Sequence, residues 1–126
     1  MPMIVFNFGP LSKNELTLSF DNEGAFYLIQ SLSGLGGKRD EETMACLHLD
    51  KQEKWAGFFT VYISDFDTVN IDGHHLKIGL DEGSLEYLVF KLEKFLSDGD
   101  FSPSEFIALS RPGRKYDIQV YLRRIA

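Results

Sequence analysis

The chain has 126 residues and a formal net charge of −6, with 44% hydrophobic and 25% charged residues. This length suits one domain, and the composition is that of a globular protein rather than a disordered one. No apolar stretch reaches the roughly 18 residues of a membrane span, the N-terminus lacks the basic segment of a signal peptide, and the single cysteine, Cys46, excludes an internal disulfide. We therefore expect one cytoplasmic domain over residues 1–126.

The first half of the chain predicts two strands, a helix and two further strands. Alternating apolar and polar side chains indicate strands at Ile4–Phe8, Glu15–Phe20, Ala45–Leu49 and Phe58–Ile63. Asp21 is the expected N-cap of a helix whose apolar residues recur at helical spacing from Ala25 to Leu35. Residues 50–57 are expected to form a loop that carries Trp55, and an acidic connector, residues 64–67, follows the last strand.

The second half repeats this order. Strands are expected at Val69–Ile71, His75–Leu80, Glu105–Leu109 and Asp117–Arg123. Asp81 is a second N-cap, and the amphipathic helix after it ends at Gly99. A Pro-Gly pair at the centre of residues 111–114 indicates a turn before the last strand.

The two halves align without a gap when Leu16–Leu35 is placed over Leu76–Phe95. Five pairs are identical: Leu16/Leu76, Asp21/Asp81, Tyr27/Tyr87, Leu28/Leu88 and Leu32/Leu92. We therefore predict an α+β domain built as a tandem strand–helix–strand–strand repeat, with halves at about 1–66 and 67–126. Because each unit has one apolar sheet face, we expect a mainly antiparallel sheet with both helices packed on one face.

Residues able to carry chemistry are few. His48, His74 and His75 lack the spacing of a metal site. His48 lies two residues from Cys46 on the same strand face, but nothing else completes a nucleophilic site, and the glycines at 34, 36 and 37 follow a helix instead of preceding one. We expect no enzymatic activity, no catalytic residue, no metal and no cofactor.

Strand alternation divides the sheet into two faces. The face expected to pack on the helices contains Leu16, Leu18, Leu47, Leu49, Phe59, Val61, Ile107, Leu109, Ile118, Val120 and Leu122. The opposite face contains Tyr62, Tyr121 and Arg123, residue types that anchor interfaces but also occur on ordinary solvated sheets. Trp55 is a second candidate anchor, or a residue that folds back onto the core.

Part of the first half resembles a known family. Residues 14–20 (Asn-Glu-Leu-Thr-Leu-Ser-Phe), the leucine-bearing helix after them and Leu47-His48-Leu49-Asp50 resemble the small α/β immunity proteins of bacterial toxin–immunity systems. That resemblance implies a non-enzymatic inhibitor that binds a cognate toxin, often a basic nuclease, through an acidic surface. Residues 1–110, with 8 basic and 18 acidic residues, fit such a surface, whereas the basic residues 111–126 depart from it.

We therefore expect a protein-binding module whose partner is another protein, such as a toxin domain. The expected contact residues are Asp40, Glu41, Glu42, Trp55, Tyr62, Asp65, Asp67, Tyr121 and Arg123. The acidic ones among them could equally be solvated connectors. Two alternatives stay open: a self-assembling homo-oligomer such as a homodimer, and a nucleic-acid binder using Arg111, Arg114, Lys115, Arg123 and Arg124, which the acidic bulk disfavours.

Overall fold

The computed structural model describes residues 2–9, 12–36 and 40–125, and these fold into eight strands and two helices. In chain order the elements are β1 (Ile4–Phe8), β2 (Glu15–Phe20), α1 (Asn22–Leu32), β3 (Glu41–Asp50), β4 (Glu53–Ile63), β5 (Thr68–Asp72), β6 (His75–Leu80), α2 (Glu82–Asp98), β7 (Glu105–Leu109) and β8 (Ile118–Arg124). The prediction of an α+β fold is confirmed. Within the described ranges, neither helix combines the length and apolar character needed to cross a membrane.

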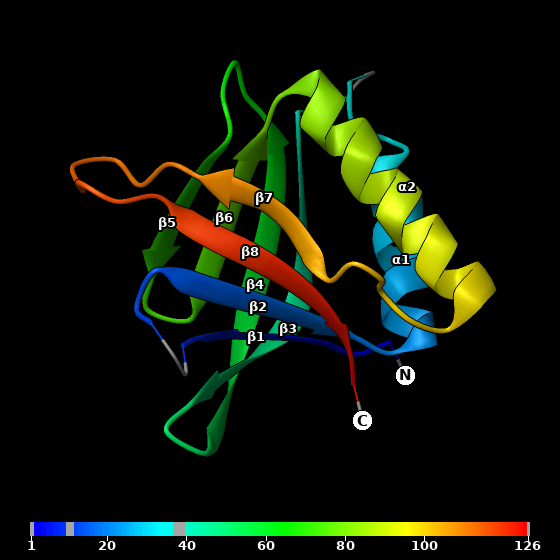
Figure 1. The fold of residues 1–126 in the computed structure, drawn as a ribbon, viewed down its shortest axis with the longest axis horizontal. Helices are drawn as coiled ribbons and strands as arrows, with labels where there is room; N and C mark the ends of the chain where they lie inside the picture. The colour runs from blue at the N-terminus through cyan, green and yellow to red at the C-terminus, as the bar shows by residue number, and fades with distance from the viewer. Residues whose placement is uncertain (1, 10–11, 37–39, 126) are drawn as a thin grey trace.

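All eight strands belong to one sheet, in the order β5-β6-β4-β3-β1-β2-β8-β7. The sheet is mostly antiparallel, with four antiparallel pairs between consecutive strands and three parallel pairs: β1 with β3, β2 with β8, and β4 with β6. The two edges also meet, because the Val69 N–H donates to the Ser110 carbonyl at 2.9 Å. The sheet is therefore nearly closed on itself (Figure 1).

Closure gives the molecule two different ends. The turns that join β1 to β2, β3 to β4, β5 to β6 and β7 to β8 lie at one end, because the parallel pairings align these hairpins. We call this the hairpin end. Strands β2 and β6 run away from these turns and lead into α1 and α2. The two helices lie side by side (Figure 1). We call this opposite end the helix end.

The strand pairings are unchanged when the two halves are exchanged. In this exchange each strand of the first half takes the place of the strand four later in the chain, and the reverse. The antiparallel pairs β1–β2 and β3–β4 then become β5–β6 and β7–β8, and the parallel pair β2–β8 becomes the parallel pair β6–β4. The β1–β3 pair becomes the contact of Thr68, at the start of β5, with Ser110 beyond β7. Each half contains two strands before its helix and two after it.

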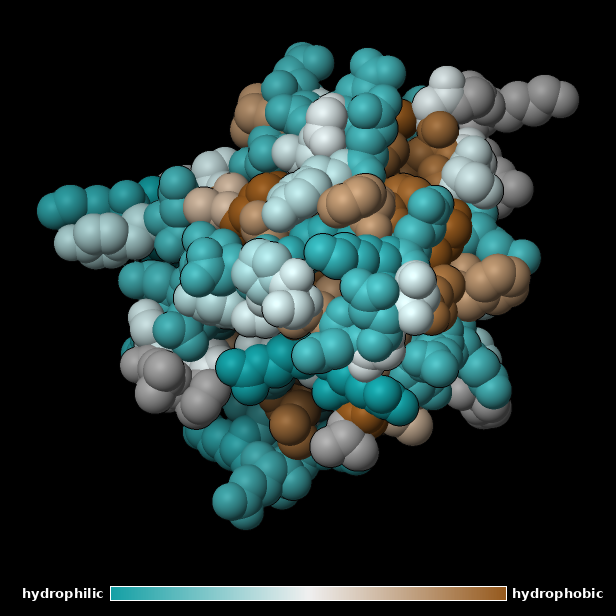
Figure 2. All heavy atoms as spheres, turned by 45° about the vertical axis from the view of Figure 1, so that its right-hand side comes forward, coloured by the Kyte–Doolittle hydropathy of each residue, from teal (hydrophilic) through white to brown (hydrophobic). Residues whose placement is uncertain are grey.

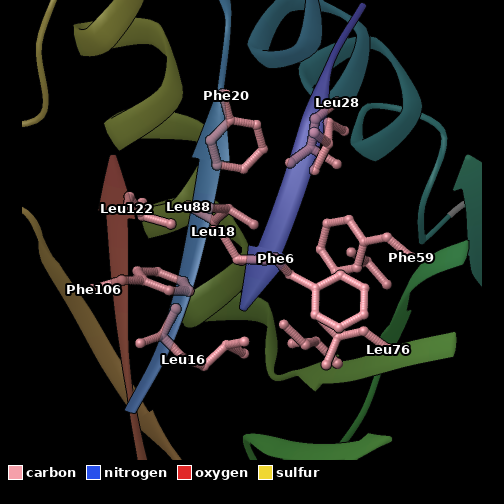
Figure 3. Packing of buried hydrophobic residues seen from close by; sticks show 14 of the residues in the cluster. Phe6, Leu16, Leu18, Phe20, Leu28, Phe59, Leu76, Leu88, Phe106 and Leu122 are labelled. Carbon is pink, nitrogen blue, oxygen red and sulfur yellow. The ribbon is translucent and has the colours of Figure 1, made fainter. Parts of the chain in front are cut away.

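The inside of the curled sheet and the inner faces of both helices form one hydrophobic core (Figure 3). Both predicted N-caps are confirmed: Asp21 accepts from the Gly24 N–H at 2.6 Å, and Asp81 accepts from the Ser84 N–H at 2.7 Å. Gly99 ends α2 in the left-handed conformation, with φ of 82°. Apolar helical residues then pack onto the sheet interior; they include Leu28, Leu88, Leu92 and Phe95.

The prediction of the inward-facing residues is wrong on two strands. On β3, Met44, Cys46 and His48 are buried, whereas Leu47 and Leu49 are only half-buried. On β7 the register shifts between Glu105 and Ala108, so Phe106 is buried in place of Ile107. A slip of one residue moves every side chain of a strand to the other face. Because both faces of β3 carry apolar residues, the alternation in the sequence did not show which face points inward.

The predicted loop at residues 50–57 is also wrong, because β4 begins at Glu53 and includes Trp55. The strands β3 and β4 form one long hairpin, with Asp50 paired to Glu53. Only Lys51 and Gln52 form the turn, and both have positive φ, 49° and 69°. Such tight turns favour Asn-Gly or Gly-Gly, and the missing glycine is why the sequence did not indicate a hairpin here.

We expect Gln52→Gly to stabilise the protein by roughly 0.5–1 kcal/mol, because glycine adopts positive φ without the cost that a side chain adds. The free energy of unfolding in urea measures this gain. Lys54→Gly is the matched control: it places the same residue two positions later, inside β4, where glycine should destabilise. Equal effects of the two substitutions would contradict the turn assignment.

Candidate functional site

The pairing of β3 with β4 brings two separate acidic segments together at the helix end. Glu41 lies opposite Tyr62 in the pairing, and the Ile63 N–H donates to the Asp40 carbonyl at 3.1 Å. The chain then continues directly into Asp65 and Phe66. We call this surface the acidic rim, and its residues are Asp40, Glu41, Glu42, Tyr62, Ile63, Asp65 and Phe66. Five of the nine predicted contact residues belong to it.

The acidic rim also presents apolar side chains. Phe66 is 63% exposed and Ile63 is 39% exposed, although both are large and hydrophobic. Tyr62 is half-buried, because its ring covers Gly79 on β6 so closely that a Cβ there would lie 2.7 Å from the Tyr62 Cζ. The rim thus combines negative charge with hydrophobic groups that are available for contact.

Asp67 was expected in the same surface, but its side chain is occupied within the fold. Its carboxylate accepts from the Asp81 N–H at 3.0 Å and from the Ser84 hydroxyl at 2.7 Å. Its carbonyl accepts from both the N–H and the hydroxyl of Ser110. Asp67 therefore fastens the connection between β4 and β5 to the start of α2 and to the end of β7.

Two grooves extend the surface from the acidic rim along the outer face of α1. The first groove has a volume of about 410 Å³ and is lined by Tyr27, Gln30, Ser31, Ser33, Gly34 and Glu42. The second, mainly apolar groove has a volume of about 460 Å³ and is lined by Pro2, Asn22, Glu23, Phe26, Tyr27, Gln30 and Leu96. Tyr27 and Gln30 line both, so the grooves are continuous. Figure 2, in which the helix side comes forward, shows small groups of hydrophobic side chains among hydrophilic ones.

The C-terminus of α1 lies at the junction of the rim and the grooves. It carries the negative end of the helix dipole, and the last turn of α1 contains no basic residue. Glu42 lies beside that terminus, since its Oε1 is 3.8 Å from the position of a Cβ on Gly34.

The other predicted contact residues lie elsewhere. Trp55 is near the opposite end of β4, at the hairpin end, and its ring stacks on His74 with centroids 5.3 Å apart. Tyr121 and Arg123 lie on β8, and three strands separate β8 from β4 in either direction around the sheet. Tyr62 and Tyr121 both alternate with buried neighbours and so lie on the outer face of the sheet, as predicted, but the curling of the sheet keeps them apart instead of bringing them together.

The basic residues near the C-terminus do not form one patch. Arg111, Arg114 and Lys115 lie in the β7–β8 turn at the hairpin end, whereas Arg123 and Arg124 lie at the other end of β8. Arg124 also donates from Nη1 to the Gly99 carbonyl at 3.1 Å, at the C-terminus of α2. The two groups of basic residues thus lie at opposite ends of β8, whereas the nucleic-acid alternative requires them to form one surface.

Two kinds of catalytic chemistry, a cysteine nucleophile and a metal site, depend on the surroundings of the side chains. Burial raises the pKa of the Cys46 thiol to about 12, which favours the neutral thiol over the nucleophilic thiolate at neutral pH. Over residues 2–9, 12–36 and 40–125, no three His, Cys, Asp or Glu side chains come together in a way that could hold a metal ion.

Helix α1 contributes exposed aromatic side chains that were not predicted. Phe26 is 53% exposed and Tyr27 also points outward, although both lie in a short amphipathic helix. Their positions fall outside the apolar helical spacing of Ala25, Leu28 and Leu32, and that mismatch was a signal available in the sequence.

Comparison with known proteins gives no relative from which a role could be transferred. No family model, curated protein or solved structure matches the chain. The function must be inferred from the geometry of this chain.

We expect Asp67→Ala to lower the free energy of unfolding by roughly 1–3 kcal/mol, because it leaves two hydrogen-bond donors at the start of α2 without their acceptor. Thermal or urea denaturation measures this loss. Asp65→Ala is the matched control on the exposed neighbour, and it should change stability by no more than about 0.5 kcal/mol. A larger loss for Asp65→Ala than for Asp67→Ala would contradict this division of roles.

Proposed function

We propose that this protein is a non-enzymatic, cytoplasmic protein-binding module, and specifically an immunity-type inhibitor that binds a basic toxin domain. The binding surface is the acidic rim together with the two grooves along α1. One observation carries the proposal: Glu42 belongs to both the rim and the first groove, and Tyr27 belongs to both grooves. A partner can therefore contact acidic and aromatic groups on one continuous surface.

The composition of this surface suits a protein partner. Exposed aromatic side chains such as Phe26, Tyr27 and Phe66 supply the large, rigid contacts that dominate binding energy at interfaces. The surrounding carboxylates supply electrostatic steering toward a basic surface and discrimination against acidic ones. A small inhibitor that must capture its target quickly needs both properties.

We also infer that the two halves of the chain are copies of one strand–strand–helix–strand–strand unit. The five identities between the halves and the exchange of strand pairings support this inference. The halves differ most in the acidic rim, which the second half does not reproduce: Arg123 and Arg124 lie at the end of β8, the counterpart of β4. Binding specificity then lies in the first half, on a shared scaffold.

The test is affinity capture with the immobilised protein from a lysate of its source organism, followed by purification of the captured partner. We expect a basic protein whose complex weakens at high salt. The triple variant Asp40→Lys/Glu41→Lys/Asp65→Lys should weaken binding roughly tenfold or more, because like charges would then face each other. Addition of the unmodified protein should abolish the partner's toxic activity.

The matched control is Glu53→Lys/Asp72→Lys/Asp117→Lys, which changes the net charge equally at the hairpin end, where all three residues are exposed. This variant should bind normally. Binding lost equally in both triple variants would mean that only net charge matters, and an unaffected rim variant would exclude the acidic rim.

Self-association through the mainly apolar groove is the competing function, since Phe26 and Leu96 are hydrophobic groups that line it. Sedimentation at low micromolar concentration distinguishes the two. We expect a monomer, and a dimer that Phe26→Ala dissociates would instead support self-assembly.

A further inference from the structure

Two imidazole rings meet at the hairpin end, away from the acidic rim. His48 on β3 is 9% exposed, and its Nδ1 lies 2.9 Å from the Nδ1 of His74, in the β5–β6 turn. Phe6 stacks on the inner side of His48, with centroids 4.4 Å apart and an interplanar angle of 13°. Trp55 stacks on the outer side of His74, with an angle of 10°. Four rings therefore run from the core to the surface.

The backbone around this pair is closely fitted. The Phe58 N–H donates to the His74 carbonyl at 3.0 Å, and a Cβ at Gly57 would collide with that carbonyl oxygen. The β5–β6 turn is thus pressed against β4, which holds His74 between His48 and Trp55. His74 thus contacts both His48 and Trp55.

We propose that His48 and His74 form a proton-operated latch, which holds Trp55 across the hairpin end and releases it when both rings are protonated. A hydrogen bond between two Nδ1 atoms needs one donor and one acceptor. With no added proton, one ring donates to the bare nitrogen of the other. With one added proton, an imidazolium donates to a neutral ring, and this charge-assisted bond is the stronger one. With two, neither nitrogen can accept, and two positive charges oppose each other.

The environment of His48 disfavours its protonation. Burial lowers the pKa of His48, and the neighbouring His74 lowers it further. The carboxylate of Asp50 acts in the opposite direction and raises the pKa of His48. The pair therefore titrates as a coupled system.

Several other titratable groups lie on the elements around the pair. The titratable groups near the pair are Cys46 and Asp50 on β3, Glu53 and Lys54 at the start of β4, and Asp72 and His75 beside the β5–β6 turn. Strand β1 contributes Phe6 and Phe8, which do not titrate. Cys46 stays neutral, and His75 bonds to Thr60 rather than to the pair, with 2.7 Å between its Nε2 and the Thr60 Oγ1.

The direction of the pH effect follows from linkage. The folded state holds His48 neutral at pH values where the unfolded chain, with an ordinary pKa of 6.5, already binds a proton. The contribution of His48 to stability is therefore fully present above pH 6.5 and is lost as the pH drops through the lowered pKa of folded His48. At low pH the stack of rings at the hairpin end therefore separates, so that two positively charged imidazoles are exposed and Trp55 no longer stacks on His74.

Trp55 is the single tryptophan of the chain, so its fluorescence reports the latch directly. We expect a change in Trp55 emission below pH 6.5, together with an increase of about twofold in acrylamide quenching, because the stacked ring is only 44% exposed. Far-UV circular dichroism should stay constant through this change. Coincident loss of the circular dichroism signal, or no change in emission down to pH 4, would overturn the proposal.

Two variants assign the change to the pair. His48→Gln and His74→Gln each leave one titrating ring beside a group that can accept a hydrogen bond, so the Trp55 transition should disappear. His74→Gln changes the exposed ring, and it keeps the test decisive if His48→Gln fails to fold. His75→Gln is the matched control on the neighbouring histidine, at the start of β6, and should retain the transition. Loss of the transition in His75→Gln, or its persistence in His74→Gln, would exclude the latch.

Discussion

The contact between the two edge strands is the constraint on which the rest of the structure depends. The Val69 N–H and the Thr68 hydroxyl both donate to the Ser110 carbonyl, while Ser110 donates back to the Asp67 carbonyl. These bonds join β5 to the end of β7, so an open sheet becomes a nearly closed one with a single core. An open sheet would instead leave the backbone groups along the edges of β5 and β7 unpaired.

Closure also decides where binding can occur. The large side chains inside the sheet are packed together, including Phe6, Phe20 and Phe59, so the chemistry available to a partner lies on the outer surface and at the two ends. At the helix end, Asp67 links the closing contact to the N-terminus of α2. Asp65 and Phe66 directly precede Asp67, and the acidic rim is thus supported by the same bonds that close the sheet.

The sequence predicted the elements well because their signals are local. The caps at Asp21 and Asp81 and the left-handed Gly99 act within one helical turn, and strand β6 follows from alternation alone. These features depend on neighbouring residues only. The tandem repeat stays an inference, because similar alternation and capping arise in any two units of this kind.

Features that depend on distant strands could not be derived in the same way. The inward side of β3 is set by its parallel pairing with β1, where Phe6 lies opposite His48. The separation of Tyr62 from Tyr121 follows from strand order, which alternation does not encode. For the acidic rim, the sequence supplied the acidic segments, but only the β3–β4 register shows that Asp40 lies beside Ile63. Trp55 was predicted as a candidate anchor, or as a residue that folds back onto the core, but its contact with His74 depends on that register too.

The imidazole pair stands apart from these fold-determining contacts. A buried polar side chain is compensated by its hydrogen bond but gains little over an apolar residue of similar size. Met44 and Cys46, which face the core on the same side of β3 as His48, are apolar. Core packing alone would therefore favour an apolar residue at position 48. A second imidazole placed 2.9 Å away, in a turn held by Gly57, indicates that this position is shaped by proton binding as well as by packing.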